Sequence, residues 1–382
     1  MRILLNAVNV IGAGATVVVQ NLLDALPIAG RQHRFTAVIP GAFDTAGLTP
    51  QDNLELIRDG RRLPRTVTRL EDIARDVAVW CRRYDAECCF TLGDVGPTRL
   101  PVPHAVLLHQ NFIAYRLPEV ERLWPQSERL KFRFTRWQFG RMAPNCAAIF
   151  VQTPVMAQQV CQTYRLPQDR VHVVLQTIPA GLREDAQRPR EMLPAMAAVA
   201  KPFRLLFLAA GYEHKNHLVL MELARILRRR GLSQSVQIFV TLDPAGRRYE
   251  QNVLGQLAEF QDCVTNLGRL SRAQVAMAYA ASQALFLPTL AESFGLIYLE
   301  AMAFGVPVLT SDRDFARWMC GEHATYFEPT DPESIADAIE SAMATGTAPA
   351  STAWAAQRLA SFPDSWNEVA AGYLQVLEKC CD

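Results

Sequence analysis

The sequence lacks any apolar run as long as the roughly 18 residues that a helix needs to cross a bilayer. Its opening stretch, MRILLNAVNVIGAG, is interrupted by Asn6 and Asn9 too early for the apolar core of a secretory signal peptide. Low-complexity tracts and repeats of solenoid length are also missing. We therefore expect a globular protein that works in the cytoplasm, rather than a membrane-spanning, secreted or repeat protein.

Cysteine patterns that hold a metal are absent as well. The chain has nine cysteines, an odd number, and none shows the spacing of a zinc site. The adjacent pairs Cys88-Cys89 and Cys380-Cys381 suit reduced thiols better than a disulfide framework. No pair of aspartates flanked by turn residues indicates a Mg²⁺ site. We expect neither a metal nor another cofactor.

The charges that are present are divided unevenly, although the formal net charge is only +1. Residues 1–200 carry 24 basic against 18 acidic side chains, and residues 201–382 carry 15 against 20. One segment of the basic half suits an anionic membrane surface, and it equally suits a solvated helix whose long cations lie along apolar neighbours. Its cations and aromatic rings are interleaved: Arg129, Lys131, Arg133, Arg136 and Arg141 with Phe132, Phe134, Trp137 and Phe139.

Short apolar runs that favour strands alternate with helical patterns. A chain of 382 residues is too long for one ordinary core, so we expect two domains of roughly 150 to 200 residues. Strands that are apolar throughout belong to parallel sheets covered on both faces. We interpret the proline- and charge-rich residues 179–202 as a linker between two doubly wound, Rossmann-like α/β domains that face a cleft. The expected strands lie at 2–8, 35–40, 88–93, 104–110, 147–153 and 170–176, and then at 203–211, 235–242, 284–289 and 307–311.

The stretch LAESFGLIYLEAMAFGVPVLTSD, residues 290–312, follows an expected strand and contains a helix that begins near Phe294 and ends at Gly305. Glu292 therefore lies where the carboxyl end of a strand meets the amino end of a helix, which is the ligand edge of an open α/β sheet. Unpaired backbone N–H groups and the helix dipole favour a phosphate there. Because an ionised carboxylate only accepts hydrogen bonds, Glu292 and Glu300 suit sugar or ribose hydroxyls. The alternative is an ordinary helix cap and a half-exposed helix residue.

The longer run LPTLAESFGLIYLEAMAFGVPVLTSD resembles the signature of the retaining GT-B glycosyltransferases of family 4, in which two glutamates separated by seven residues enclose a Ser/Gly-Phe-Gly step. TNLGRLSRAQVAMAYAASQALFLPT and YFEPTDPESIADAI are similar to the same family, so the resemblance covers at least residues 203–340. It implies the GT-B fold. Residues 1–185 plus 360–382 would form the N-terminal, acceptor-side domain, and residues 186–359 the nucleotide-sugar-binding domain.

The resemblance also implies roles for single residues. Glu292 would contact the donor sugar's hydroxyls near the transferred carbon, and Glu300 would hold the nucleotide ribose. In AAGYEHKNHLVL, Lys215 matches the lysine that neutralises the diphosphate, although from the residues alone it could be an exposed loop lysine. The rest of the donor-binding segment is Ser293, Phe294, Gly295 and Leu296, the last three through backbone N–H groups.

One departure from the family pattern concerns the cations. The family usually has an arginine about five positions before the lysine, where this chain has Ala210 and Gly211. Either another cation substitutes for that arginine, with Arg269 and His214 as candidates, or diphosphate binding relies more on helix ends.

In the first domain, Gly12 and Gly14 follow the first strand in a loop similar to the family's glycine-rich loop, where glycine permits close backbone approach to a ligand. His109, at a strand end, matches a family histidine that touches the donor sugar. A structural histidine is the alternative from the residues alone.

The activity implied by the resemblance is a retaining, metal-independent hexosyl transfer from a UDP- or GDP-linked sugar to an acceptor hydroxyl, in the assembly of cell-surface polysaccharide or glycolipid. The expected partners are the donor, a saccharide or lipid-linked saccharide acceptor, and the anionic inner face of the cytoplasmic membrane, but not nucleic acid. A nucleotide-sugar epimerase and a catalytically silent GT-B partner subunit are the alternatives. A dinucleotide-dependent oxidoreductase fits poorly, because Val17 stands where Gly-x-Gly-x-x-Gly needs its third glycine.

Overall fold

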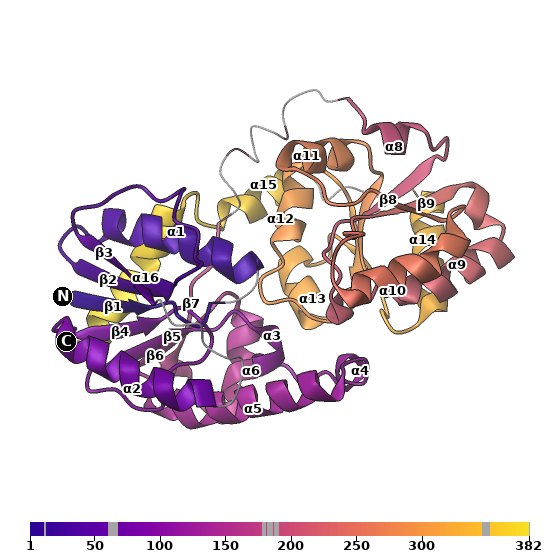
Figure 1. Cartoon of the computed structure of the whole chain (residues 1–382). Coiled ribbons are helices and arrows are strands. Elements are labelled where there is room, and N and C mark those ends of the chain that lie inside the picture. The colour runs from indigo at the N-terminus through magenta and orange to yellow at the C-terminus, as the bar shows by residue number, and fades with distance from the viewer. Residues whose placement is uncertain are drawn as a thin grey trace. The chain divides into compact units, whose positions relative to one another are not determined.

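A computed structural model describes residues 1–10, 13–59, 68–177, 191–345 and 352–381, together with residues 181 and 186. The chain forms two compact units, each with its own sheet (Figure 1). Much of the predicted linker, between residues 179 and 190, lies outside the described residues. The first unit contains Met1–Arg116, Pro125–Thr177 and Pro363–Asp382, and the second contains Leu117–Trp124 and Ile178–Phe362.

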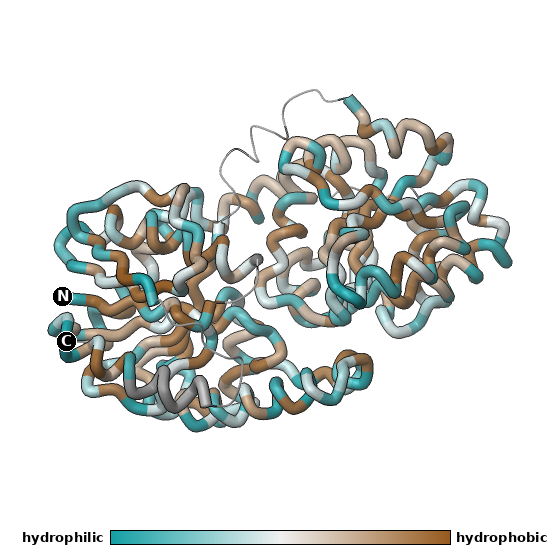
Figure 2. Tube along the Cα trace, in the orientation of Figure 1, coloured by the Kyte–Doolittle hydropathy of each residue, from teal (hydrophilic) through white to brown (hydrophobic). Residues whose placement is uncertain are grey.

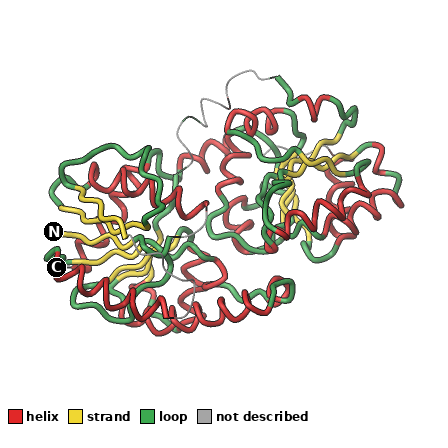
Figure 3. Tube along the Cα trace, in the orientation of Figure 1, coloured by secondary structure: helices red, strands yellow, loops and turns green. Residues whose placement is uncertain are grey.

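The first unit is built on a sheet whose described strands all pair in parallel, in the order β3-β2-β1-β4-β5-β6-β7 (Figure 3). The order changes direction between β1 and β4, which are neighbours in the sheet. The strands are β1 (Arg2–Asn6), β2 (Arg34–Pro40), β3 (Leu54–Asp59), β4 (Cys88–Thr91), β5 (His104–Leu107), β6 (Ala148–Val151) and β7 (Val171–Val173).

Helices cover both faces of this sheet, because alternate residues of each strand point to opposite faces. On β1, Ile3 and Leu5 belong to the core formed with α1 and α16, whereas Leu4 packs in a second cluster with α2. Figure 2 shows the apolar strands between helices with more polar outer surfaces. The helices of this unit are α1 (Ala13–Ala29), α2 (Thr68–Arg83), α3 (Asn111–Ala114), α5 (Gln126–Met142), α6 (Pro154–Tyr164) and α16 (Trp366–Cys381).

Helix α16 is part of the core of the first unit, although it follows the whole second unit in the sequence. Its Tyr373 is fully buried, and the ring lies 5.5 Å from the ring of Phe90 on β4 and 4.9 Å from that of Phe150 on β6, measured between centroids. Burying an aromatic side chain of this size stabilises a fold by about 2 to 3 kcal/mol. The first unit therefore depends on a distant stretch of the chain.

The second unit has a parallel sheet in the order β10-β9-β8-β11-β12-β13, which changes direction between β8 and β11. The predicted fold class, two doubly wound parallel α/β domains, is confirmed for the described parts of both units. Among the described helices, none combines the length and apolar character needed to cross a bilayer. The strands are β8 (Phe203–Phe207), β9 (Val236–Val240), β10 (Val264–Asn266), β11 (Ala284–Leu287), β12 (Val308–Ser311) and β13 (Thr325–Phe327).

Helices flank the second sheet, and several start just after the carboxyl end of a strand (Figure 1). In doubly wound sheets, ligands bind beyond the carboxyl ends of the strands, at the point where the strand order changes direction. The loops after β8 and β11 therefore frame the expected site. The helices are α4 (Pro118–Glu121), α8 (Pro194–Ala197), α9 (Val219–Arg229), α10 (Arg248–Leu257), α11 (Arg272–Ala280), α12 (Leu296–Ala303), α13 (Asp314–Cys320), α14 (Pro332–Thr345) and α15 (Thr352–Ala360).

Candidate functional site

Two predicted residues, Lys215 and Glu292, meet at the carboxyl edge of the second sheet. Lys215 ends a single 3₁₀ turn, Glu213–Lys215, in the loop after β8, and Glu292 lies in the loop between β11 and α12. The Lys215 ammonium donates a hydrogen bond to Oε1 of Glu292, and the two side chains are only 18% and 11% exposed. Since β8 and β11 are the neighbours between which the strand order reverses, the ion pair lies at the switch point.

The backbones of the two loops are tied together independently of this ion pair. The N–H of Leu290 donates to the carbonyl oxygen of His214 at 2.7 Å, and the hydroxyl of Thr289 donates to the same oxygen at 3.2 Å. Asn216 has a left-handed backbone conformation, and its side chain donates to the carbonyl of Pro329 at 2.7 Å. Lys215 is therefore held on both sides by backbone contacts, which fixes the place from which its side chain extends.

The turn into α12 requires a glycine at residue 295. Gly295 has φ +80, and a Cβ built there would lie 2.7 Å from Cδ2 of Tyr298. The hydroxyl of Tyr298 is in turn hydrogen-bonded to that of Thr310 at 2.8 Å, so the ring has a fixed position. Phe294 is buried against the ring of Phe362, with 5.8 Å between centroids. These contacts position the segment that runs from Ser293 to Leu296, whose N–H groups at the start of α12 lack intrahelical acceptors.

Glu300 lies on α12 and is half-buried, with a partner that the sequence analysis did not identify. The hydroxyl of Tyr279, on α11, donates to Oε2 of Glu300 at 3.1 Å. Burial raises the pKa of Glu300, while the hydrogen bond from Tyr279 and the charge of Arg272 lower it. The structure therefore presents a carboxylate that one hydroxyl already orients.

The two predicted substitute cations have different surroundings. Burial, together with the charge of Lys215, holds the pKa of His214 well below its usual range, so the imidazole is neutral at neutral pH. This lowered pKa disfavours His214 as the substitute cation. Arg269 is exposed, and its Nη1 lies 3.6 Å from Oδ2 of Asp243.

Glu250 occupies the space beside Ala210 and Gly211, where the resemblance predicts an arginine. Its buried carboxylate accepts hydrogen bonds from the N–H groups of Gly211 (3.2 Å), Asp243 (3.2 Å) and Arg247 (3.0 Å). A Cβ on Gly211 would lie 1.8 Å from Cγ of Glu250, so residue 211 cannot carry a side chain here. The sequence analysis missed Glu250; its place three residues after the residue that caps α10 is the available signal.

In the first unit, His109 follows β5 and lies beside Asp94, which has a left-handed backbone after β4. The N–H groups of His109 and Gln110 donate to Oδ1 of Asp94 at 2.6 and 2.8 Å. Burial lowers the pKa of His109 and raises that of Asp94, and each group's charge opposes the shift of the other. Within the described residues, the buried Nε2 of His109 has no hydrogen-bond partner, which is uncommon for a buried polar atom.

The predicted glycine-rich loop is only partly described. Gly12 lies outside the described residues, whereas Gly14 lies in the first turn of α1. A Cβ built on Gly14 would have no described atom within 4 Å. Packing within the described chain therefore gives no reason for a glycine at this position, and ligand approach stays a prediction.

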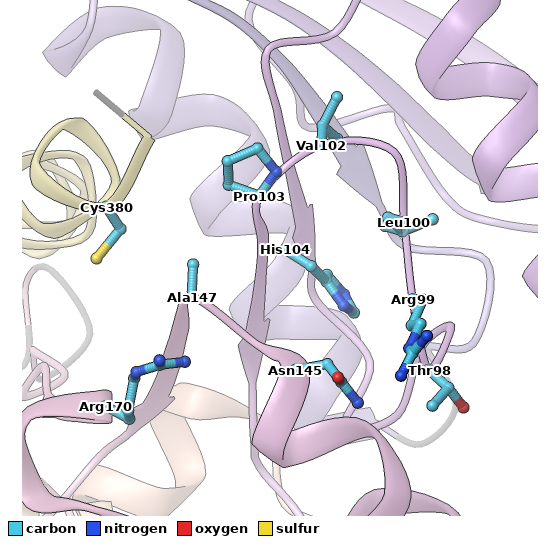
Figure 4. Close-up of a pocket in the computed structure, with 10 residues that line it drawn as sticks. All are labelled: Thr98, Arg99, Leu100, Val102, Pro103, His104, Asn145, Ala147, Arg170 and Cys380. Atoms are coloured by element: carbon cyan, nitrogen blue, oxygen red, sulfur yellow. The ribbon is translucent and has the colours of Figure 1, made fainter.

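A cavity of about 500 Å³ lies at the amino ends of the strands of the first sheet, opposite the edge that carries His109 (Figure 4). It is lined by residues that precede or begin strands, such as His104 at the start of β5 and Ala147 before β6, and by the exposed side chains of Arg99 and Arg170. Nε2 of His104 is hydrogen-bonded to the hydroxyl of Thr91 at 2.8 Å, and burial lowers the pKa of His104 to about 4. The cavity contains none of the predicted site residues.

Comparisons with known proteins agree with this architecture. The family model "Glycosyl transferases group 1" matches residues 191–358, and "Glycosyltransferase Family 4" matches residues 12–179. A D-inositol 3-phosphate glycosyltransferase from Pseudarthrobacter chlorophenolicus is 27% identical over 177 residues, which cover 45% of this chain and 41% of that protein. The chain thus spans less than half the length of that relative.

Solved structures with the same fold cover nearly the whole chain. Sucrose-phosphate synthase from Thermosynechococcus elongatus has a TM-score of 0.68 at 17% identity, over 99% of this chain and 98% of that one. Anabaena Alr3699/HepE, solved in complex with UDP-glucose, has a TM-score of 0.66 at 16% identity, over 98% of this chain and 99% of that one. At these identities the likeness concerns the fold.

Proposed function

The chain belongs to the GT-B glycosyltransferases of family 4, and on that premise we propose that it moves a hexose from a UDP- or GDP-linked sugar to an acceptor hydroxyl, with retention of configuration and without a metal ion. A saccharide or lipid-linked saccharide on the route to a cell-surface polysaccharide or glycolipid is the proposed acceptor. One of the structural neighbours above was solved with UDP-glucose, which supports a nucleotide-sugar donor.

The observation that carries the proposal is the Lys215–Glu292 pair at the switch point of the second sheet. A lysine there offers a positive charge to a diphosphate, and the carboxylate beside it accepts hydrogen bonds from sugar hydroxyls. The N–H groups at the start of α12 add donors for the phosphate oxygens. In this proposal Glu300 holds the ribose and His109 contacts the donor sugar through its unpartnered Nε2.

The proposed reaction takes place on one face of the sugar ring. The bond between the anomeric carbon and the diphosphate oxygen breaks, and a bond from the acceptor oxygen to the same carbon forms on the same face. The acceptor's proton passes to an oxygen of the leaving diphosphate. The leaving group gains negative charge as the bond breaks, so Lys215 and the backbone N–H groups stabilise the transition state more than the bound substrate.

Nucleoside diphosphate release tests this proposal. The purified protein is incubated with each of a panel of UDP- and GDP-sugars, with and without saccharide acceptors and with EDTA present throughout. We expect release of the diphosphate only when an acceptor is added, and an unchanged anomeric configuration in the product by NMR. Release without an acceptor, an inverted product, or activity abolished by EDTA and restored by Mg²⁺ would contradict the proposal in its stated form.

Helix α5 supports a further partner, an anionic membrane surface. Leu130 and Trp137 on this helix are each 54% exposed, and Arg133 and Arg141 are exposed on the same helix. The guanidinium of Arg141 lies 5.1 Å above the ring of Trp137. Exposed apolar anchors among cations are typical of helices that bind the interface of acidic bilayers.

Not every cation of this segment belongs to that surface. Arg136 and Phe139 belong to the segment that was predicted to suit a membrane surface, but both are buried. The Arg136 guanidinium donates to the carbonyls of Phe112 at 2.6 Å and Tyr115 at 3.2 Å, which gives it a structural role. That part of the prediction is wrong, because the helix must turn one side towards the core of its own unit.

Sedimentation with vesicles tests the membrane proposal. The protein should bind vesicles that contain phosphatidylglycerol and not vesicles of phosphatidylcholine alone, and binding should weaken as salt is raised. Trp137→Ser and Arg133→Glu should each reduce binding. Arg225→Glu, at an exposed arginine of α9 in the second unit, is the matched control and should not. Equal binding by all four proteins would remove α5 from the interface.

A further inference from the structure

The positive charge near the Lys215 loop is too small to neutralise a bound diphosphate. Lys215 supplies one positive charge and is paired with Glu292. His214 is held neutral by burial, and Arg269 faces Asp243. A nucleoside diphosphate carries at least about two negative charges, more than one lysine balances, and arginine is the residue whose donors match phosphate oxygens in pairs. Another cation at this edge of the sheet is therefore needed if the proposed function holds.

Arg247 lies against the same loop, although it follows β9 and not β8. Its guanidinium carbon is 4.8 Å from the centre of the Tyr212 ring. The Tyr212 ring is stacked on that of His214, with 5.6 Å between centroids and 29° between planes. The positive charge of Arg247 also contributes to the lowered pKa of His214. Arg247 therefore lies against the loop that carries Lys215.

The backbone of Arg247 is fixed by the same carboxylate that fixes the loop after β8. Glu250 accepts a hydrogen bond from the N–H of Arg247 at 3.0 Å and one from the N–H of Gly211 at 3.2 Å. The two loops therefore cannot move apart without breaking bonds to a buried carboxylate, which is costly. This bridge holds the base of the Arg247 side chain at a defined place beside the Lys215 loop.

The side chain of Arg247 is exposed, and in the described part of the chain no carboxylate pairs with it. Stacking on an aromatic ring uses the face of a guanidinium and leaves the N–H groups at its edge able to donate. Those donors match two oxygens of a phosphate in a bidentate arrangement. Arg247 thus combines a preoriented cation with unused donors.

We propose that Arg247 is the cation that binds the donor's diphosphate together with Lys215, in place of the arginine missing near Ala210 and Gly211. The inference rests on the proposed function. The side chain comes from the loop after β9 because Glu250 fills the space in which a side chain on residue 211 would lie. Glu250 thus both excludes a side chain from that position and anchors its replacement.

Calorimetric titration of four proteins tests the assignment: the unmodified chain and the variants Arg247→Ala, Arg247→Lys and Arg248→Ala. Arg248 is the matched control, since it is the adjacent residue and is also exposed. The titrants are UDP and GDP, then the free nucleoside of whichever binds. Arg247→Ala should weaken diphosphate binding at least about tenfold, because a charged hydrogen bond is lost, and flatten its salt dependence. Arg247→Lys should retain part of the affinity.

The nucleoside and the control variant separate phosphate recognition from damage to the fold. Affinity for the free nucleoside should stay within about twofold in every variant, and Arg248→Ala should bind the diphosphate within about twofold of the unmodified chain. Equal diphosphate affinity in Arg247→Ala, or an equal loss for nucleoside and diphosphate, would overturn the assignment alone. If the unmodified chain binds neither UDP nor GDP, the proposed function fails and this inference fails with it.

Discussion

The ammonium group of Lys215 donates a hydrogen bond to the carboxylate of Glu292, although 77 positions of sequence separate the two residues. Both side chains are largely buried, so removing either charge leaves the other without its partner in a place where water compensates poorly. Glu292 also competes with any anionic ligand for the ammonium group of Lys215. In the proposed function, a diphosphate that binds Lys215 would displace the contact with Glu292, whose carboxylate could then accept hydrogen bonds from sugar hydroxyls.

Replacing Glu292 by Gln should separate turnover from nucleotide binding. The amide keeps the shape but loses the charge, so we expect turnover to fall by about 10²- to 10³-fold. Nucleoside diphosphate affinity should be unchanged or slightly higher, because Lys215 no longer has a competing carboxylate. Steady-state kinetics and calorimetry check the two parts. Unchanged turnover would refute the role of Glu292 at the sugar.

Replacing Glu300 by Ala should weaken nucleoside diphosphate binding by about 1 to 3 kcal/mol, if the carboxylate accepts hydrogen bonds from the ribose. Tyr279→Phe is the matched variant, because it removes the orienting hydroxyl and leaves the carboxylate in place. It should cost about 1 kcal/mol of affinity or less. Calorimetry with the ribonucleotide and its 2′-deoxy form measures both, and equal affinity in Glu300→Ala would remove Glu300 from the site.

Gly295→Ala should destabilise the second unit more than Gly305→Ala does. Both glycines have positive φ, which costs an alanine about 1 to 2 kcal/mol. Only at residue 295 would the new Cβ also collide with a ring, that of Tyr298 at 2.7 Å, whereas nothing lies within 4 Å at residue 305. The difference between the two melting temperatures therefore measures the collision. Equal losses would show that the Tyr298 ring moves freely.

Acid should destabilise the second unit through His217, which is fully buried and stacked 4.3 Å from the ring of Phe207. Burial, with the charge of Lys215, lowers the pKa of His217 to about 3, whereas an unfolded histidine titrates near about 6.5. The unfolded state thus binds the proton more readily. The contribution of His217 to the free energy of unfolding is complete above pH of about 6.5. It decreases as the pH falls towards the pKa of His217 in the folded state.

Between pH 7 and pH 5 the loss from His217 should be about 2 kcal/mol. The variant His217→Phe keeps an aromatic ring for the stack and removes the titrating group. Its urea unfolding free energy should therefore vary less with pH than that of the unmodified chain. Parallel pH curves for the two proteins would assign the acid sensitivity to other groups.

The sequence predicted the strands that are buried on both faces, but of the four edge strands it predicted only β7. Runs such as CCFT of β4 and ALFL of β11 are fully buried, and their continuous apolar character identified them. The missed strands were β3, with the charged and partly exposed sequence LELIRD, and the three-residue strands β10 and β13. An edge strand has one neighbour, so its sequence carries a weaker apolar signal.

The backbone structure of the candidate site was predictable only where it is encoded locally. The Glu-Ser-Phe-Gly step indicated a turn into a helix, and Gly295 is in the left-handed conformation that such a turn requires. The contacts of Tyr279 with Glu300, and of Glu250 with two loops, depend on residues that are 21 and 39 positions apart. No periodicity or spacing rule connects such pairs, because they are created when the strands take their places in the sheet.

Because α16 is the last helix of the chain, the first unit can complete its folding only after the second unit has been synthesised. The ring of Tyr373 lies beside Phe90 and Phe150 in the core of the first unit, but the ribosome makes it only after residues 178–362 have been translated. During translation the second unit can therefore fold while the first unit still exposes the apolar surface that α16 covers in the finished protein. If the ribosome stalls or a protease cleaves the chain just before α16, the first unit should remain incompletely folded. Its exposed apolar surface should then bind chaperones or cause aggregation.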